Sequence, residues 1–133
     1  MTYLLDTHTL LWALFEDEKL SVKAREAISD AANEIYVSVI SYWEISLKFA
    51  MGRLGLQGIT PDELPEKTRE IDIDTLDLLE EDAITFYQLP RLKHKDPFDR
   101  LIIWQAIRRD IPLISKDKHM EDYQQFGLVT LWS

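Results

Sequence analysis

Short apolar runs alternate with stretches of helical periodicity along the whole chain, and this alternation is the strongest constraint on its fold. Each run is too short for a helix, and the five lie at residues 3–5, 35–39, 71–73, 112–115 and 128–131. Between them, apolar spacing and capping residues predict helices at residues 7–15, 21–32, 41–51, from 60 onward, at 80–89 and at 96–109. Buried strands joined by helices form a parallel sheet covered on both faces. We therefore expect a three-layer α/β/α sandwich in one domain, residues 1–133.

The composition excludes several classes of protein. The chain has no cysteine, which rules out a disulfide scaffold, thiolate catalysis and metal sites built on sulfur. Residues 1–6 lack the basic segment of a signal peptide, and no apolar run approaches the roughly 18–20 residues that span a bilayer. We therefore expect a cytoplasmic protein with no membrane partner.

The charge is unevenly distributed. The formal net charge is −9, which is the wrong sign for indiscriminate binding to nucleic acid. Residues 91–119 nevertheless contain eight bases and only four acids. Such a basic segment could follow a phosphate backbone, but helix ends and loops are commonly charged, so charge alone does not decide the function.

Two of the candidate functional acids stand at the ends of expected strands. Asp6 ends the first strand, and Asp117 follows the strand at 112–115 by two residues. In open parallel sheets, binding and catalysis occur at the carboxyl ends of the strands. Taken singly, each acid has a structural alternative as a helix cap or turn residue, and that alternative is favoured.

A glutamate in the helix at 41–51 is a third candidate. Helical spacing puts Glu44 on an apolar stripe with Ile40, Trp43, Leu47, Ala50 and Met51. A buried glutamate is unfavourable unless it is paired. Glu44 can form an i,i+4 ion pair with Lys48, so the structural and the functional interpretation carry equal weight.

The segment 96–100 contains two acids with different expected roles. Asp96 precedes Pro97 and is expected to be the N-cap of the helix at 96–109. Asp99 occupies the third helical position, which suits the helix dipole, but it also precedes the apolar face of this helix. We therefore expect Asp99 rather than Asp96 to point into a cleft near the sheet.

The four acids Asp6, Glu44, Asp99 and Asp117 thus come from four segments of one sheet. Two carboxylates about 4 Å apart repel by roughly 4 kcal/mol at an effective dielectric near 20, so such a group needs a shared proton or a cation. Oxygen ligands without cysteine favour Mg²⁺ or Mn²⁺ over zinc. A carboxylate-held cation beside basic residues suits phosphodiester cleavage.

Four stretches of the chain, at residues 3–12, 37–48, 89–106 and 113–117, resemble the PIN-domain ribonucleases, and among them the VapC-type toxins of toxin–antitoxin pairs. The resemblance implies a parallel five-stranded sheet in an α/β/α sandwich and an acidic Mg²⁺ or Mn²⁺ site that cleaves RNA. The acids of the family fall on Asp6, Glu44, Asp99 and Asp117, and its hydroxyl residues fall on Thr7 and Ser115. Residues 72–74 are more acidic than expected for the third strand of the family.

Basic and aromatic residues near these acids have open roles. Lys48, Arg100 and Lys116 could steady a phosphate, although a solvated surface or ion pairs with the same acids are at least as good an account. We expect His8 and His94 to be hydrogen-bonding or surface residues rather than bases. The tryptophans at 12, 43 and 104 are expected in the core or an interface rather than stacked on nucleobases.

The resemblance also implies partners. A free ribonuclease would damage its own cell, so we expect a VapB-like antitoxin. The helix at 41–51 is apolar on two sides, one with Trp43 and Leu47 and another with Ile45 and Phe49, which predicts a homodimer and an antitoxin contact. Alternatively, this helix is simply buried all round.

Other classes of function fit less well. A receiver domain or an Asp-x-Asp phosphatase needs further acids near Asp6, where Thr7 and His8 stand, and four glycines supply no phosphate loop. A catalytically silent PIN module that binds RNA or protein is the remaining alternative.

Overall fold

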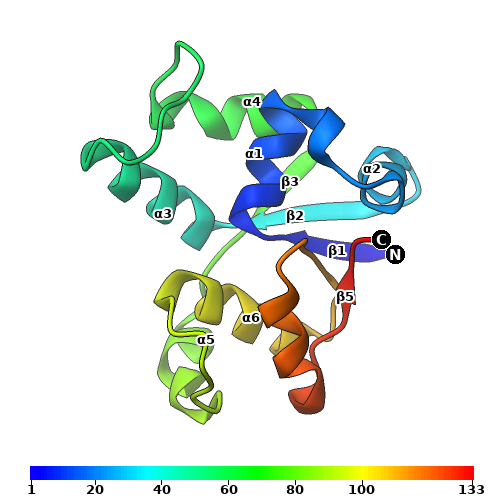
Figure 1. Ribbon diagram of the computed structural model, residues 1–133, viewed down its shortest axis with the longest axis vertical. Coiled ribbons are helices and arrows are strands. Elements are labelled where there is room, and N and C mark those ends of the chain that lie inside the picture. The colour runs from blue at the N-terminus through cyan, green and yellow to red at the C-terminus, as the bar shows by residue number, and fades with distance from the viewer.

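The computed structural model describes all residues from 1 to 133 and contains one parallel sheet between two layers of helices (Figure 1). The sheet has five strands in the order β3-β2-β1-β4-β5. Their bounds are β1 Thr2–Leu5, β2 Glu34–Ser38, β3 Ile73–Leu76, β4 Leu113–Ile114 and β5 Thr130–Leu131. The predicted three-layer sandwich with a parallel five-stranded sheet is confirmed.

The helices divide between the two faces of the sheet. In Figure 1, α1, α2 and α4 lie on one side, and α5, α6 and the 3₁₀ helix η4 lie on the other. The helix α3 begins directly after β2 and contacts both α1 and α6. The helix bounds are α1 Thr7–Phe15, α2 Val22–Ser29, α3 Val39–Ala50, α4 Leu64–Glu70, α5 Glu80–Thr85, α6 Pro97–Arg109 and η4 Lys118–Phe126, with shorter 3₁₀ turns η1 Asp17–Lys19, η2 Pro61–Glu63 and η3 Phe86–Gln88. None of these helices has the length and apolar character needed to cross a lipid bilayer.

Alternate residues of the short strands face two separate hydrophobic cores. Leu5 belongs to the core under α1, α2 and α4, whereas its neighbour Leu4 belongs to the core under α6 and η4. In β4, Ile114 and Leu113 divide in the same way. Because successive side chains of a strand point to opposite faces, a strand buried on both sides must be apolar throughout. This requirement explains the continuous apolar runs in the sequence.

The order of the strands reverses between β1 and β4. From β1 the chain passes outward through β2 to β3, and it then crosses to the other side of β1 to form β4 and β5. Ligands of open parallel sheets bind outside the carboxyl ends of the strands at such a reversal. Two long-range contacts close this point: Asp6 N–H donates to the Ile114 carbonyl at 3.3 Å, and Thr9 Oγ1 donates to the same carbonyl at 3.0 Å.

Several element boundaries differ from the sequence prediction, and three of them illustrate the causes. The third strand begins at Ile73, two residues later than expected, because Asp72 has a left-handed φ of 60° and turns the chain out of α4. Asp74 points to solvent, so an acid is tolerated in this edge strand. The helix predicted at 21–32 ends at Ser29, and the one predicted at 80–89 changes to the 3₁₀ turn η3 at Phe86.

Candidate active site

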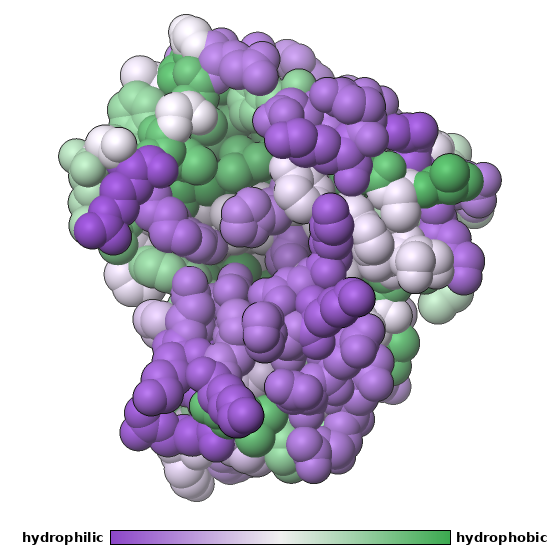
Figure 2. All heavy atoms as spheres, in the orientation of Figure 1, coloured by the Kyte–Doolittle hydropathy of each residue, from purple (hydrophilic) through white to green (hydrophobic).

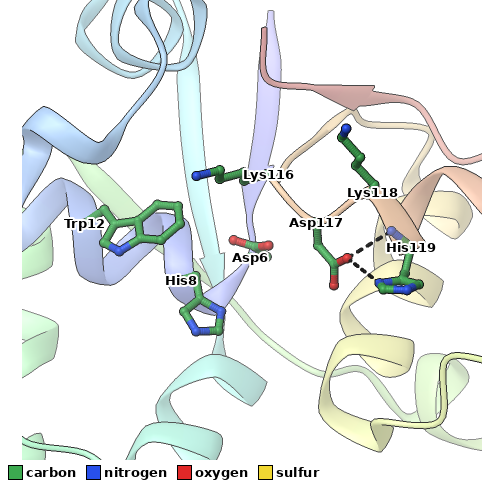
Figure 3. A pocket seen from close by; sticks show the side chains of 7 residues that line it. All are labelled: Asp6, His8, Trp12, Lys116, Asp117, Lys118 and His119. Atoms are coloured by element: carbon green, nitrogen blue, oxygen red, sulfur yellow. Dashed lines mark hydrogen bonds and ion pairs between the residues drawn. The ribbon is translucent and has the colours of Figure 1, made fainter.

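An open pocket of about 490 Å³ lies beyond the carboxyl ends of β1 and β4, at the reversal of strand order. Figure 3 shows the side chains that line it, which come from α1, from η4 and from the turns that follow β1 and β4. They are Asp6, His8, Trp12, Lys116, Asp117, Lys118 and His119. The two strand-end acids of the sequence analysis therefore share one pocket.

Asp6 is held rigidly at the base of this pocket. It is the N-cap of α1, where Oδ1 accepts a hydrogen bond of 2.9 Å from the backbone N–H of Thr9. Its other oxygen accepts a bond of 2.5 Å from Ser115 Oγ, which comes from the end of β4. Burial raises the pKa of Asp6, although the hydrogen bonds from Ser115 and Thr9 oppose the shift. The cap and the site residue are thus the same side chain, so the two interpretations of Asp6 do not exclude each other.

Glu44 is buried on α3, with 4% of its surface exposed, and both of its oxygens are bonded. Thr7 Oγ1 donates to Oε1 at 2.7 Å, and Lys48 Nζ donates to Oε2 at 2.5 Å. Burial alone would lower the pKa of Lys48, but the hydrogen bond and charge of Glu44 outweigh burial and raise it. The i,i+4 ion pair considered from the sequence is present, and it makes the buried carboxylate tolerable.

The surroundings of Glu44 differ from the apolar stripe that the sequence predicted. The buried residues of α3 are Ile40, Ser41, Glu44 and Ile45. Trp43 is 59% exposed, and Leu47 also faces solvent. The buried face is rotated because α3 packs against both α1 and α6 and sits astride the two layers. Of the alternatives for this helix, burial all round is wrong, since one apolar side is open.

Asp99 and Asp96 join Glu44 in a carboxylate cluster. One oxygen of each of these three residues lies within 4.8 Å of the others. Burial, followed by the negative charges of Asp96 and Glu44, raises the pKa of Asp99 to about 6, and the hydrogen bond from His94 opposes this shift. Repulsion of this kind is what a divalent cation would relieve.

The cluster contains one acid that the sequence analysis assigned to capping alone. Asp96 does cap α6, because Oδ1 accepts from the backbone N–H groups of Phe98 at 2.9 Å and Asp99 at 3.3 Å. It also stands one turn before Asp99, and residues three apart lie on the same face of a helix. That i,i+3 spacing was the available signal that both acids would reach the cluster.

Asp117 and Asp6 lie outside this three-carboxylate cluster. Asp117 Oδ1 accepts from the backbone N–H of His119 at 2.9 Å and pairs with His119 Nδ1 at 3.0 Å. His94 bridges the two groups, because its Nε2 lies 3.0 Å from Asp99 Oδ2 and its ring stacks on His119 at 6.0 Å. The four acids of the sequence analysis therefore form two adjacent groups rather than one set at ligand distance.

Of the three bases considered for phosphate contact, only Lys116 is free at the pocket. Lys116 is exposed and lines it, whereas Lys48 is paired with Glu44. Arg100 is committed elsewhere: its guanidinium donates to the carbonyls of Leu89 and Pro90 and stacks over Phe86 at 4.8 Å. These contacts tie Arg100 to the loop before α6 and give a phosphate role for it no support.

The donor set of the carboxylate cluster suits a hard divalent cation. It consists only of carboxylate oxygens, and Mg²⁺ and Mn²⁺ prefer oxygen ligands. A family model described as PIN domain matches residues 3–125.

The chain belongs to the PIN-domain family. This PIN domain is 30% identical to the protein named Ribonuclease VapC22 of Mycobacterium tuberculosis, over 131 residues that make up 98% of each chain. The predicted membership is confirmed by these two comparisons.

Solved structures share the fold of this PIN domain at low sequence identity. One is VapBC2 from Rickettsia felis bound to a DNA fragment from its promoter, with a TM-score of 0.67, 14% identity and complete coverage of both chains. Another is DNA-bound VapBC from Salmonella typhimurium, with a TM-score of 0.65, 15% identity and coverage of 98% of this chain and 97% of that one. VapBC-5 from Mycobacterium tuberculosis has a TM-score of 0.60 and 14% identity, and covers 99% and 98% of the two chains. At these identities the similarity establishes the fold alone.

Proposed function

We propose that this protein is a metal-dependent endoribonuclease toxin that is neutralised by a VapB-like antitoxin. The observation that carries the proposal is the cluster of Glu44, Asp96 and Asp99, in which burial and then the charges of the other two acids raise the pKa of Asp99 to about 6. The 30% identity to a named VapC ribonuclease along nearly the whole chain supports RNA as the substrate.

Glu44, Asp96 and Asp99 would hold Mg²⁺ or Mn²⁺, with Asp6 and Asp117 at the adjoining pocket. When bound, such an ion neutralises charge on a phosphate and lowers the pKa of a water for attack on phosphorus. Thr7 fixes the orientation of the Glu44 carboxylate, and Ser115 does the same for Asp6. His94 holds Asp99 through Oδ2.

Lys48 has a specific role in this proposal. Its ammonium neutralises Glu44 while the cluster is free of metal. With a cation bound at the cluster, Lys48 would no longer be needed to neutralise Glu44 and would be available to contact the RNA phosphate. Lys116 lies at the other side of the site, on the rim of the pocket (Figure 3).

The test is RNA cleavage measured with Mn²⁺, with Mg²⁺ and with EDTA. We expect cleavage with either ion and none with EDTA, together with a rise in melting temperature at millimolar Mn²⁺, because an ion that binds only the native state stabilises it. Full activity in EDTA would refute the metal dependence. A thermal shift without cleavage of any RNA would favour the silent PIN module.

Exposed apolar surfaces support the partner part of the proposal. Trp43, Leu47 and Met51 are exposed along and just after α3. A separate groove between α1 and the segment after α3 is lined by apolar residues that include Leu11, Phe15, Leu54 and Leu56. Figure 2 shows hydrophobic residues gathered in this region of an otherwise largely hydrophilic face.

We expect these two surfaces to bind a second copy of the chain and the antitoxin, since large exposed apolar patches mark interaction sites. Light scattering of the pure protein should show a dimer, and the product of the adjacent gene should copurify and inhibit cleavage. A strict monomer with no copurifying protein would remove this part of the proposal.

The single sheet and the family match to residues 3–125 support one domain over residues 1–133.

A further inference from the structure

The pocket beside the carboxylate cluster has an aromatic wall that the proposed metal chemistry does not use. Trp12 of α1 lines the pocket and is half-buried. Its indole is held in place by Trp132, at a centroid distance of 5.7 Å, and by His8, at 5.9 Å. A large aromatic side chain that is fixed by two neighbours and still borders a pocket is a preorganised stacking surface.

Two exposed lysines also line this pocket. Lys116 Nζ lies 5.8 Å from the centroid of the Trp12 ring, over its face. Lys118 follows two residues later, and Figure 3 shows it on the far side of Asp117 from Trp12. Both lysines are exposed, and neither forms an ion pair.

The charges of the pocket are arranged in two zones. The base carries the buried Asp6 and the half-buried Asp117, whereas the rim carries Lys116 and Lys118. A phosphate is repelled by the acids and attracted by the lysines, so it suits the rim. A neutral, flat group suits the space against Trp12.

We propose that this pocket holds one unpaired nucleobase of the RNA, stacked on Trp12, with the adjoining phosphate at Lys116 and Lys118. The inference rests on the proposed ribonuclease function and says where on this chain an unpaired nucleotide would bind. Bases in a duplex stack on one another, whereas unpaired bases can be splayed out onto aromatic side chains. Every base has a π-face, so this contact selects for an unpaired nucleotide rather than for one sequence.

The position of the pocket places this nucleotide next to the cleaved bond. Asp6 borders the pocket, and the residue after it, Thr7, donates to Glu44 of the carboxylate cluster. The stacked base and the reacting phosphate are therefore neighbours along the strand. Trp12 becomes a substrate-positioning residue, contrary to the sequence expectation of a core or interface role alone.

The experiment measures binding and cleavage separately. Short single-stranded RNAs carry 2-aminopurine at one position, which is moved along the strand, and fluorescence is followed in EDTA so that no metal-dependent cleavage occurs. We expect the wild-type protein to quench 2-aminopurine at one position next to the bond that is cut in Mn²⁺. An abasic nucleotide at that position should weaken binding by about tenfold, the size typical of one stacked base.

Variants assign the effect to Trp12. Trp12→Leu should weaken binding of the intact RNA by about tenfold and should show no further loss with the abasic RNA, whereas Trp12→Phe should recover part of the affinity. Tyr87→Leu is the matched control, because Tyr87 is an aromatic residue that is 81% exposed on η3 and lies outside the pocket. The affinity of this variant for the intact RNA should equal that of the wild type. Trp12 also packs on Trp132, so Trp12→Leu could fail to fold. The proposal is then tested by the quenching in wild type and by the affinity of Trp12→Phe for the intact and the abasic RNA.

Three results would overturn the proposal. The first is an abasic penalty as large in Trp12→Leu as in wild type. The second is equal affinity for duplex and single-stranded RNA, and the third is absence of quenching at every position. Cleavage in Mn²⁺ without quenching refutes the nucleobase pocket but leaves the ribonuclease function intact. Quenching that depends on Trp12 without any cleavage supports the pocket and refutes the ribonuclease.

Discussion

Replacing Asp99 with asparagine should abolish RNA cleavage and, at neutral pH without metal, make the protein more stable. The pKa of this carboxyl rises from its ordinary 3.8 to about 6 because of burial and then the charges of Asp96 and Glu44. An acid whose pKa is raised by folding binds more protons in the folded state between these two values, so the stability of the wild type falls as pH rises from about 4 to about 6. Above pH 6 the full penalty is present.

The size of the effect follows from the shift. A rise of about two pKa units corresponds to roughly 3 kcal/mol, and with 21% of the side chain exposed we expect Asp99→Asn to recover about 2–3 kcal/mol at pH 7.5. For a chain of this length that is a rise of roughly 6–12 °C in melting temperature. Below pH 4 the carboxyl is protonated, so wild type and variant should melt together.

The assay is thermal unfolding in EDTA from pH 3.5 to 8, repeated at saturating Mn²⁺. Asp74→Asn removes one negative charge from an exposed position of β3 and controls for the general effect of a less acidic chain. Mn²⁺ should raise the melting temperature of wild type and of this control but not of Asp99→Asn. Equal stability of Asp99→Asn and wild type at pH 7.5 in EDTA would refute the electrostatic reasoning about the cluster.

Two further predictions test the cap and a structural ion pair. In EDTA, Asp96→Asn should be about 1 kcal/mol more stable than Asp96→Ala, because asparagine keeps the N-cap, and calorimetry should show weaker Mn²⁺ binding for both. The second concerns Asp82, which is fully buried and pairs with Arg109 and Arg108. Burial alone would raise the pKa of Asp82, but these ion pairs and the hydrogen bond from the Leu79 N–H outweigh burial and lower it to about 2. Asp82→Asn should therefore lower the free energy of unfolding by about 3 kcal/mol at pH 7, measured by urea unfolding. In the wild type, the stability that the ionised Asp82 contributes is complete above pH 4 and is lost as pH falls through 2.

Much of the fold could be predicted from the sequence because the strands are buried on both faces. Such strands are continuous apolar runs, and the capping residues Asp6, Ser21 and Asp96 mark the following helices. The late start of β3, in contrast, depends on one backbone angle. The left-handed conformation of Asp72 delays β3, and no spacing of apolar residues signals it.

The candidate site was only partly predictable. Acids at strand ends could be found, since parallel strands bring their carboxyl ends to one edge. The buried face of α3 could not be predicted, because it depends on the packing of α3 against α1 and α6, which lie in distant parts of the chain. The division of the acids into two groups depends likewise on His94 and His119, whose rings meet only in the folded protein.

The closure of β1 against β4 has a consequence for the timing of synthesis. Asp6 is made at the start of the chain, but the side chain that fixes its second oxygen, Ser115, is made 109 residues later. The carbonyl of Ile114 that bonds Thr9 is equally late. While a ribosome is still extending the chain, the first strand lacks β4, one of its two neighbours, and the pocket lacks one wall. An unfinished chain that ends before Ser115 therefore contains Asp6, Glu44 and Asp99 while Asp6 is not yet fixed and the pocket is incomplete.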